Sequence, residues 1–155
     1  MAKQSAGLLL YKIVDGEPLV FLVHPGGPFW ARKDAGAWSI PKGEVAEGED
    51  ALAAARREFA EETGQSVEGR FHPLGPCRQT GGKLIQAWAI EGDADEAVTS
   101  NSFEMEWPPK SGRRQSFPEV GRAAWLTLDA ARARLNPGQI PLLDELAALL
   151  AWRHS

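Results

Sequence analysis

Residues 43–64, GEVAEGEDALAAARREFAEETG, form the most informative stretch of this 155-residue chain. Apolar side chains such as Leu52 and Phe59 recur in it at helical spacing, and Gly64 stands where a helix commonly ends. The spacing therefore predicts a helix over residues 49–63, with three glutamates in its last turns.

The glutamates of this helix lie close to one another. Glu58 and Glu62 stand four residues apart, which places them about 6 Å apart along the axis and roughly 40° apart around it. Glu61 flanks them. Like charges at this spacing repel by a few tenths of a kcal/mol, and the helix dipole costs each carboxylate roughly 0.3–1 kcal/mol more. A divalent cation offsets such a cost, and Mg²⁺ favours carboxylate oxygens combined with substrate phosphates.

A plainer interpretation of the same glutamates needs no ion. Arg57 can pair with Glu61 one turn along the helix, and a charged helix face is commonly just solvated. The residues that flank the glutamates decide between the two interpretations.

The flanking residues follow the pattern G-x5-E-x7-R-E-φ-x-E-E-x-G, where φ is apolar. This pattern resembles the signature box of the Nudix hydrolase family. The chain matches it at Gly43, Glu49, Arg57, Glu58, Phe59, Glu61, Glu62 and Gly64. An apolar residue usually closes the box and Gln65 stands there instead, a departure that affects packing behind the loop rather than the metal face.

The resemblance implies a role for each polar residue of the box. Glu58 and Glu62 are expected to be the main ligands of Mg²⁺, which Mn²⁺ can replace, and the backbone carbonyl of Gly43 is expected to join them. Glu61 is implied as a further ligand or as a residue that positions metal-bound water. Arg57 is implied to orient the glutamates, and Glu49 to be a structural or secondary metal-site residue.

Many members of the family take the catalytic base from a glutamate outside the box, and the candidates here are Glu104, Glu106 and Glu119. Residues 117–126, FPEVGRAAWL, resemble the segment before the last strand in dinucleoside polyphosphate hydrolases of the family. We therefore favour Glu119. The other two glutamates are also explained as the solvent face of a strand.

The segment that leads into the box, residues 38–43 or WSIPKG, resembles the W-x-x-P-K-G of asymmetrical dinucleoside tetraphosphate hydrolases. Lys42 is expected to meet a phosphate oxygen of the substrate. A nucleobase is expected to stack on Trp38 or Trp30, an interaction of roughly 1–3 kcal/mol in nucleic-acid sites. Further cations, Lys83, Arg113 and Arg114, have no position assigned by the sequence.

The rest of the chain alternates apolar runs with turn residues. Strands are predicted at 5–14 and 18–23 around the turn Asp15-Gly16, then at 38–40, 67–73, 83–91, 103–107 and 122–126. Loops are predicted at 24–37 and, with basic character, at 110–118. Helices are predicted at 128–134, with Thr127 as its cap, and at 140–152, with Leu142, Leu143, Leu146, Leu149 and Leu150 on one face.

This order predicts an α/β fold in which a mixed sheet lies between helices, an α/β/α sandwich with the box as a catalytic loop-helix-loop. We expect one Nudix domain over residues 1–155. The net charge of −4 argues against a broad nucleic-acid surface. The single cysteine, Cys77, forms no intrachain disulfide and fits a reducing cytoplasm. We expect no membrane span, because no apolar run approaches 18 residues, and the oligomeric state stays open.

The expected function is Mg²⁺-dependent hydrolysis of a phosphoanhydride bond, in which metal-activated water attacks phosphorus. The substrate class favoured by the resemblance is dinucleoside polyphosphates such as diadenosine tetraphosphate. Two alternatives stay open: a nucleoside triphosphate or nucleotide-sugar pyrophosphatase, and a non-catalytic module that senses a nucleotide.

Overall fold

A long hairpin opens the chain in the computed structural model, which describes residues 4–79 and 82–153. Strands β1 (Gln4–Val14) and β2 (Glu17–Pro25) are antiparallel. Asp15 and Gly16 connect them with φ of 52° and 81°, the left-handed pair that a two-residue hairpin turn requires. The predicted hairpin is therefore confirmed.

The hairpin forms the centre of a mixed sheet. Within the described residues seven strands belong to this sheet, and its main order is β4-β6-β1-β2-β9. The added strands are β3 (Lys42–Glu44), β4 (His72–Pro73), β5 (Cys77–Arg78), β6 (Leu84–Glu91) and β9 (Val120–Thr127). β1 and β6 run parallel, whereas β3 pairs antiparallel with β1, and β9 with β2. β3 thereby brings the start of the box to the middle of the sheet.

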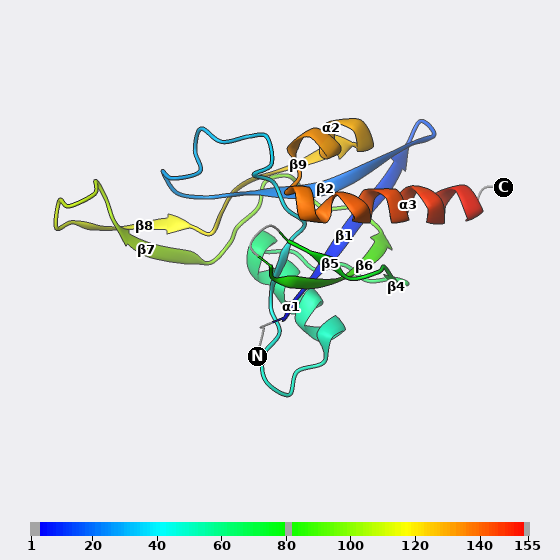
Figure 1. Ribbon diagram of the computed structural model, residues 1–155, viewed down its shortest axis with the longest axis horizontal. Helices are drawn as coiled ribbons and strands as arrows, with labels where there is room; N and C mark the ends of the chain where they lie inside the picture. Colours follow the sequence, from blue (N-terminus) through cyan, green and yellow to red (C-terminus); the bar gives the residue numbers. More distant parts are fainter. Residues whose placement is uncertain (1–3, 80–81, 154–155) are drawn as a thin grey trace.

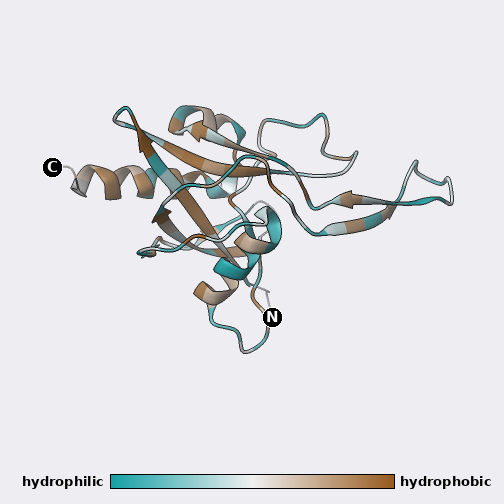
Figure 2. Ribbon diagram, turned by 180° about the vertical axis from the view of Figure 1, so that it is seen from behind, coloured by the Kyte–Doolittle hydropathy of each residue, from teal (hydrophilic) through white to brown (hydrophobic). Residues whose placement is uncertain are grey.

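Both faces of the sheet are covered by helices (Figure 1). Side chains alternate across a strand, so Leu8 and Leu10 of β1 pack with Phe59 of α1 (Ala51–Thr63) on one face. Leu9 of β1 packs on the other face with α2 (Leu128–Arg134) and α3 (Ile140–Arg153). The short helix η1 (Pro137–Gln139) precedes α3. Figure 2 shows the apolar residues running along β1 and β2. The predicted α/β/α sandwich is confirmed.

A two-stranded ribbon extends away from the sandwich (Figure 1). It consists of β7 (Ser102–Glu106) and β8 (Arg114–Pro118), with Phe103 opposite Phe117. The prediction of a loop over 110–118 was wrong for its second half. β8 carries a single half-buried apolar side chain, Phe117, among exposed residues, and so lacks the alternation that indicates a strand.

Two other predicted strands were also wrong in extent. Only His72–Pro73 of the segment 67–73 pairs with the sheet, because Val67 packs under α1 instead. In the segment 38–40, Trp38 and Ser39 form isolated bridges rather than a strand. Helix α1 begins at Ala51 rather than at residue 49, since the Asp50 side chain accepts a hydrogen bond from Ala53 N–H and caps the helix.

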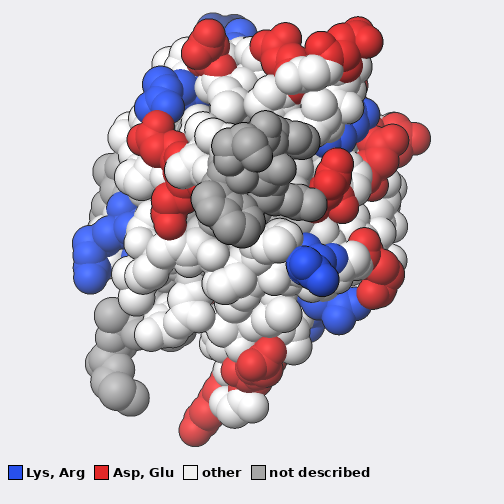
Figure 3. Space-filling view, turned by 90° about the vertical axis from the view of Figure 1, so that its right-hand side faces the viewer, with Lys and Arg blue, Asp and Glu red and all other residues white. Residues whose placement is uncertain are grey.

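No helix in the described part of the chain has the length and apolar character needed to cross a bilayer. Acidic and basic side chains are interspersed on the face drawn in Figure 3. That face therefore carries no broad basic surface of the kind that nucleic-acid-binding domains present.

Candidate active site

Helix α1 and strand β3 are packed together at the box. Gly43 lies so close to Glu58 that a Cβ atom on Gly43 would stand 2.0 Å from Glu58 Cδ. Any larger residue would displace this carboxylate. At the other end of the helix, Gly64 adopts φ 73° and its N–H donates to Ala60 O, as glycine commonly does at a helix C-terminus. Glycine is therefore required at these two positions for different steric reasons: Gly43 has no room for a side chain, and Gly64 has a left-handed φ.

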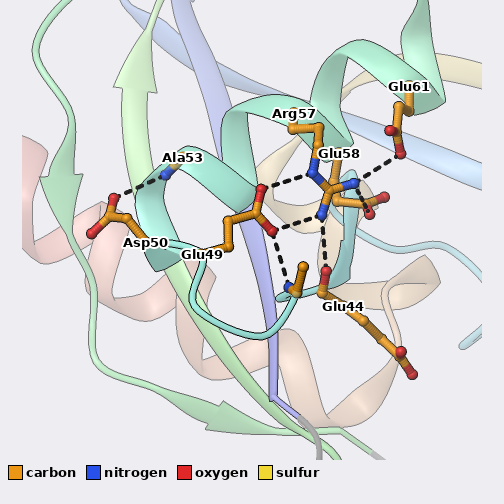
Figure 4. Close-up of polar contacts among 8 residues, drawn as sticks. Glu44, Glu49, Asp50, Ala53, Arg57, Glu58 and Glu61 are labelled. Carbon is orange, nitrogen blue, oxygen red and sulfur yellow. Dashed lines mark hydrogen bonds and ion pairs between the residues drawn. The ribbon is translucent and has the colours of Figure 1, made fainter.

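One arginine connects three of the box glutamates (Figure 4). Arg57 donates to both carboxylate oxygens of Glu49, at 2.8 and 3.0 Å, and to one oxygen each of Glu58 and Glu61, at 2.8 and 3.1 Å. A further hydrogen bond of 3.1 Å reaches Glu44 O. We call Arg57, Glu49, Glu58 and Glu61 the Arg57 cluster. It joins the loop before α1 to the last turns of the helix.

Charge pairing favours the ionised forms of Arg57 and Glu49. Hydrogen bonds from Arg57 lower the pKa of Glu49 to about 2, and the same contacts raise the pKa of Arg57. Burial raises the pKa of Glu58 above its ordinary value, although Arg57 opposes that effect. The plainer interpretation of the sequence, an ion pair between Arg57 and Glu61, is thus present in the structure. It uses one oxygen of Glu61.

Glu62 stands apart from the Arg57 cluster. Its carboxylate accepts a 3.2 Å hydrogen bond from Lys42 N–H. Burial raises the pKa of Glu62 to about 8, and the nearby negative charges of Glu58 and Glu119 act in the same direction. Burial also lowers the pKa of Lys42. Glu62 is therefore a carboxylate that needs a nearby positive charge in order to be ionised at neutral pH.

Lys42 and Glu62 share one cavity with Glu119. This cavity, which we call the site cavity, has a volume of about 200 Å³ and is lined by Val23, Pro25, Ser39, Lys42, Glu62, Glu119 and Val120. A larger cavity of about 310 Å³ lies against α1 at Ala53 and Arg56, and no carboxylate belongs to its lining. The site cavity thus combines a cation with two acidic side chains.

Glu119 reaches the site cavity through backbone hydrogen bonds that the sequence does not reveal. Its N–H donates to Asn101 O at 2.8 Å, and its carbonyl accepts from Gly26 N–H at 2.9 Å. Asn101 N–H in turn donates to Glu61 O at 3.2 Å. The segment before the ribbon therefore ties Glu119 to the end of the box helix. The length of the stretch 92–118 was the only sequence signal for this connection.

The alternative base candidates lie elsewhere. Glu104 and Glu106 belong to β7 of the ribbon and not to the lining of the site cavity. Glu106 accepts a hydrogen bond from Lys110 N–H at 2.6 Å. Arg113 and Arg114 are exposed at the ribbon. Lys83 lies nearer the box, where its Nζ is 3.2 Å from Glu44 Oε1 and its charge acts on Lys42.

The structure contradicts the predicted stacking of a base on Trp38. This side chain is only 4% exposed and packs in the core under α2 and α3. Its Nε1–H donates to Asp34 at 2.7 Å, the His24 ring stands edge-on to it, and Arg122 lies over it. No ring face is left for a base. Trp30 is half-buried, with Phe29 and Lys33 against it.

The donor set of the box suits a hard divalent cation, which binds carboxylate and carbonyl oxygens. Gly43 packs directly against the carboxylate of Glu58. Among residues 4–79 and 82–153, however, no three acidic, histidine or cysteine side chains stand in position to ligate one ion. Glu58 and Glu61 each give one oxygen to Arg57, so an ion would be bound through side-chain rotation or through their second oxygens.

Comparisons with known proteins identify the family and the fold. Residues 3–146 match the NUDIX domain family. A stretch of 55 residues is 53% identical to an RNA pyrophosphohydrolase of Caulobacter vibrioides, although the match spans only 32% of this chain and 32% of the length of that relative. The crystal structure of a C. elegans Ap4A hydrolase binary complex is similar in fold, with 24% identity, a TM-score of 0.68 and coverage of 96% of this chain and 98% of that one. The NUDIX domain of Shewanella oneidensis NrtR, complexed with ADP ribose, has 17% identity, a TM-score of 0.67 and coverage of 97% and 89%.

Proposed function

Since the chain belongs to the NUDIX domain family, we propose that it hydrolyses phosphoanhydride bonds in nucleoside diphosphate-linked compounds, foremost dinucleoside polyphosphates such as diadenosine tetraphosphate. The observation that carries the proposal is the site cavity, where Lys42, Glu62 and Glu119 meet beside the box. A cation and two carboxylates at one cavity suit a reaction that binds phosphate and moves a proton.

Nudix hydrolases generally use a divalent metal, and we propose Mg²⁺, with Mn²⁺ as a substitute. Glu58, Glu61, Glu62 and the carbonyl of Gly43 would hold it. The cation would neutralise phosphate oxygens and make a water molecule more acidic. Ionisation of Glu62, whose pKa burial raises to about 8, is favoured by a cation at this place.

The side chains of the chain have separate tasks in this reaction. Glu119 accepts the proton of the attacking water, and one P–O bond of the anhydride breaks as the new P–O bond forms. Lys42 contacts a phosphate oxygen of the substrate through its ammonium group. Arg57 touches no reacting atom in this scheme and instead holds Glu58 and Glu61 at the helix end.

Two observations support the choice of a nucleotide substrate. The segment 38–43, WSIPKG, resembles that of dinucleoside tetraphosphate hydrolases, and Lys42 of this segment lines the site cavity.

A second candidate activity is removal of pyrophosphate from the 5′ end of RNA, which the 53% identity over 55 residues with an RNA pyrophosphohydrolase favours. We also propose that the chain acts as one catalytic domain in the cytoplasm, where polyphosphate-bearing nucleotides are made.

A substrate panel separates these candidates. The protein is incubated in Mg²⁺ with one substrate at a time: diadenosine tetraphosphate, ATP, a nucleotide sugar or 5′-triphosphorylated RNA. The products are identified by chromatography. We expect ATP and AMP from diadenosine tetraphosphate at the highest kcat/KM. A higher kcat/KM for RNA would shift the assignment to the second candidate. Tight nucleotide binding without turnover in Mg²⁺ or Mn²⁺ would instead identify a sensor module.

A further inference from the structure

A fully buried amide lies directly behind the site cavity. Gln139, the last residue of η1, is 0% exposed. Its Oε1 accepts a 3.0 Å hydrogen bond from Ile40 N–H, and its Nε2 donates to Ser39 Oγ at 3.0 Å and to Gln79 Oε1 at 3.4 Å. Gln139 therefore binds both the backbone and the side chain of the segment that leads into the box.

The hydrogen-bond network determines which way this amide points. A backbone N–H can only donate, so the atom facing Ile40 N must be the oxygen of Gln139. The remaining atom is the nitrogen, which can only donate, and it faces Ser39 Oγ. Ser39 therefore receives a hydrogen bond from Gln139.

The proton of the Ser39 hydroxyl is also committed. Ser39 Oγ donates to Ile40 O at 2.7 Å. A hydroxyl has one proton and two lone pairs, so one lone pair remains after these two contacts. Ser39 is half-buried and lines the site cavity with Lys42 and Glu62. The Ser39 hydroxyl therefore has a lone pair that can accept a hydrogen bond but no proton left to donate.

We propose that Ser39, fixed in this state by Gln139, is a specificity-determining residue that accepts a hydrogen bond from a donor group of the substrate. A ribose hydroxyl and the amino group of a base both have this chemistry. A phosphate oxygen does not, because it carries no proton to donate. The inference rests on the proposed function, since it assigns a role within the same cavity. Gln139 acts through Ser39 and is a positioning residue.

The test compares substrates that differ by one donor. Values of kcat and KM are measured for diadenosine tetraphosphate and for analogues in which 2′-deoxyadenosine, 3′-deoxyadenosine or purine riboside replaces adenosine. Loss of one neutral hydrogen bond is worth about 1 kcal/mol, so the wild-type protein should favour the donor-bearing partner of one pair by about fivefold in kcat/KM. The preference should appear in KM, because the contact is made in the bound state as well as in the transition state.

The variant Ser39→Ala should erase that preference while leaving the other substrate pairs unchanged. A change in a deoxyribose pair identifies the ribose hydroxyl as the donor, and a change in the purine riboside pair identifies the base amine. The matched control is Ser66→Ala, which alters the lining of the larger cavity against α1 and should leave every ratio as in the wild type. An equal loss for all substrates, or no altered ratio, overturns the proposal.

A second variant separates the fixed hydroxyl from the mere presence of one. Gln139→Met keeps a similar volume but removes all three hydrogen bonds of the amide, so Ser39 is free to rotate and the donor preference should fall at least twofold. An unchanged preference in this variant would contradict the role of Gln139.

Calorimetric binding of non-hydrolysable ribose and deoxyribose dinucleotides gives the same comparison without turnover. If the wild-type protein turns over no substrate, the proposed function fails, and the binding ratio of wild type to Ser39→Ala still decides the role of Ser39.

Discussion

The glutamates of the Arg57 cluster and Glu62 differ in how they are stabilised. The Arg57 cluster is assembled from residues within one short stretch of sequence, and Arg57 itself is 37% exposed. Glu62 lies on the same helix but faces the site cavity, where its partners come from the segment 38–43 and from the junction of β8 and β9. Pairing lowers the pKa of Glu49 to about 2, whereas burial raises the pKa of Glu62 to about 8.

We infer from this difference that the Arg57 cluster supports the helix end, whereas Glu62 takes part in the reaction. Each carboxylate of the Arg57 cluster accepts a hydrogen bond from Arg57, so the cluster orders the helix end. Glu62 is desolvated and has a backbone N–H as its hydrogen-bond partner. A buried carboxylate with a raised pKa beside a cavity is a frequent property of functional sites. The predictions below test this division.

Glu62→Gln should give the largest effect. The variant removes the buried charge and a proposed metal ligand while keeping the shape, so we expect kcat to fall about 10²–10⁴-fold, the range of a lost acid-base or ligand group. The free energy of unfolding should stay equal or rise. The control is Glu68→Gln, an exposed residue beyond the end of α1 that pairs with Arg56. Near-wild-type turnover in Glu62→Gln would contradict the role of Glu62 in the reaction.

Glu119→Gln should follow with a loss of about 10²-fold in kcat, since Glu119 is the proposed acceptor of the water proton. Raising the pH should not restore its activity, because the amide has no basic form. Glu104→Gln, on the ribbon, serves as the comparison and should be close to wild type. If Glu104→Gln were the slower enzyme, the base would lie on the ribbon and not at the site cavity.

Arg57→Lys should weaken the Arg57 cluster while keeping the positive charge at position 57. An ammonium group has no planar fork and cannot make the two parallel bonds to Glu49. Because this pair is partly exposed, we expect a loss of about 1 kcal/mol in the free energy of unfolding. Turnover should fall about tenfold through misplaced Glu58 and Glu61. Chemical denaturation and steady-state kinetics measure the two effects, and a kinetic loss as large as that of Glu62→Gln would mean that Arg57 touches the substrate.

The smallest expected effect is a pH dependence of stability. With a folded pKa raised from 4.5 to about 8, Glu62 holds a proton in the folded protein that the unfolded chain releases above pH 4.5. The folded state then binds more protons, so the stability contributed by this group falls as the pH rises from about 4.5 to 8. In chelator, Tm of the wild type should decrease over this window more steeply than Tm of Glu62→Gln.

Added Mg²⁺ should oppose this decrease, because a metal ligand must be deprotonated to bind. The stabilisation by Mg²⁺ should therefore grow with pH in the wild type and be smaller in Glu62→Gln. Thermal unfolding at several pH values, with chelator and with Mg²⁺, makes the comparison. Identical pH profiles of the two proteins in chelator would show that Glu62 is not desolvated in solution.

The sequence by itself determined the parts of the molecule that depend on nearby residues. The hairpin around Asp15-Gly16, the box helix and the apolar face of α3 follow from local conformational preferences and from periodicity. The resemblance also named Arg57, whose hydrogen bonds reach residues at most 13 positions away in the chain. Local spacing is enough for such contacts, because a helix and its adjoining loop bring them together on their own.

Only the tertiary structure decided which of the polar and aromatic residues reach the site cavity. It buried Trp38 in the core, placed Glu119 rather than Glu104 beside Glu62, and put Gln139 against Ser39, 100 residues away in the chain. The raised pKa of Glu62 likewise depends on burial by distant segments. These properties arise when strands and loops remote in sequence pack together and exclude water. Sequence spacing within the box carries no information about that packing.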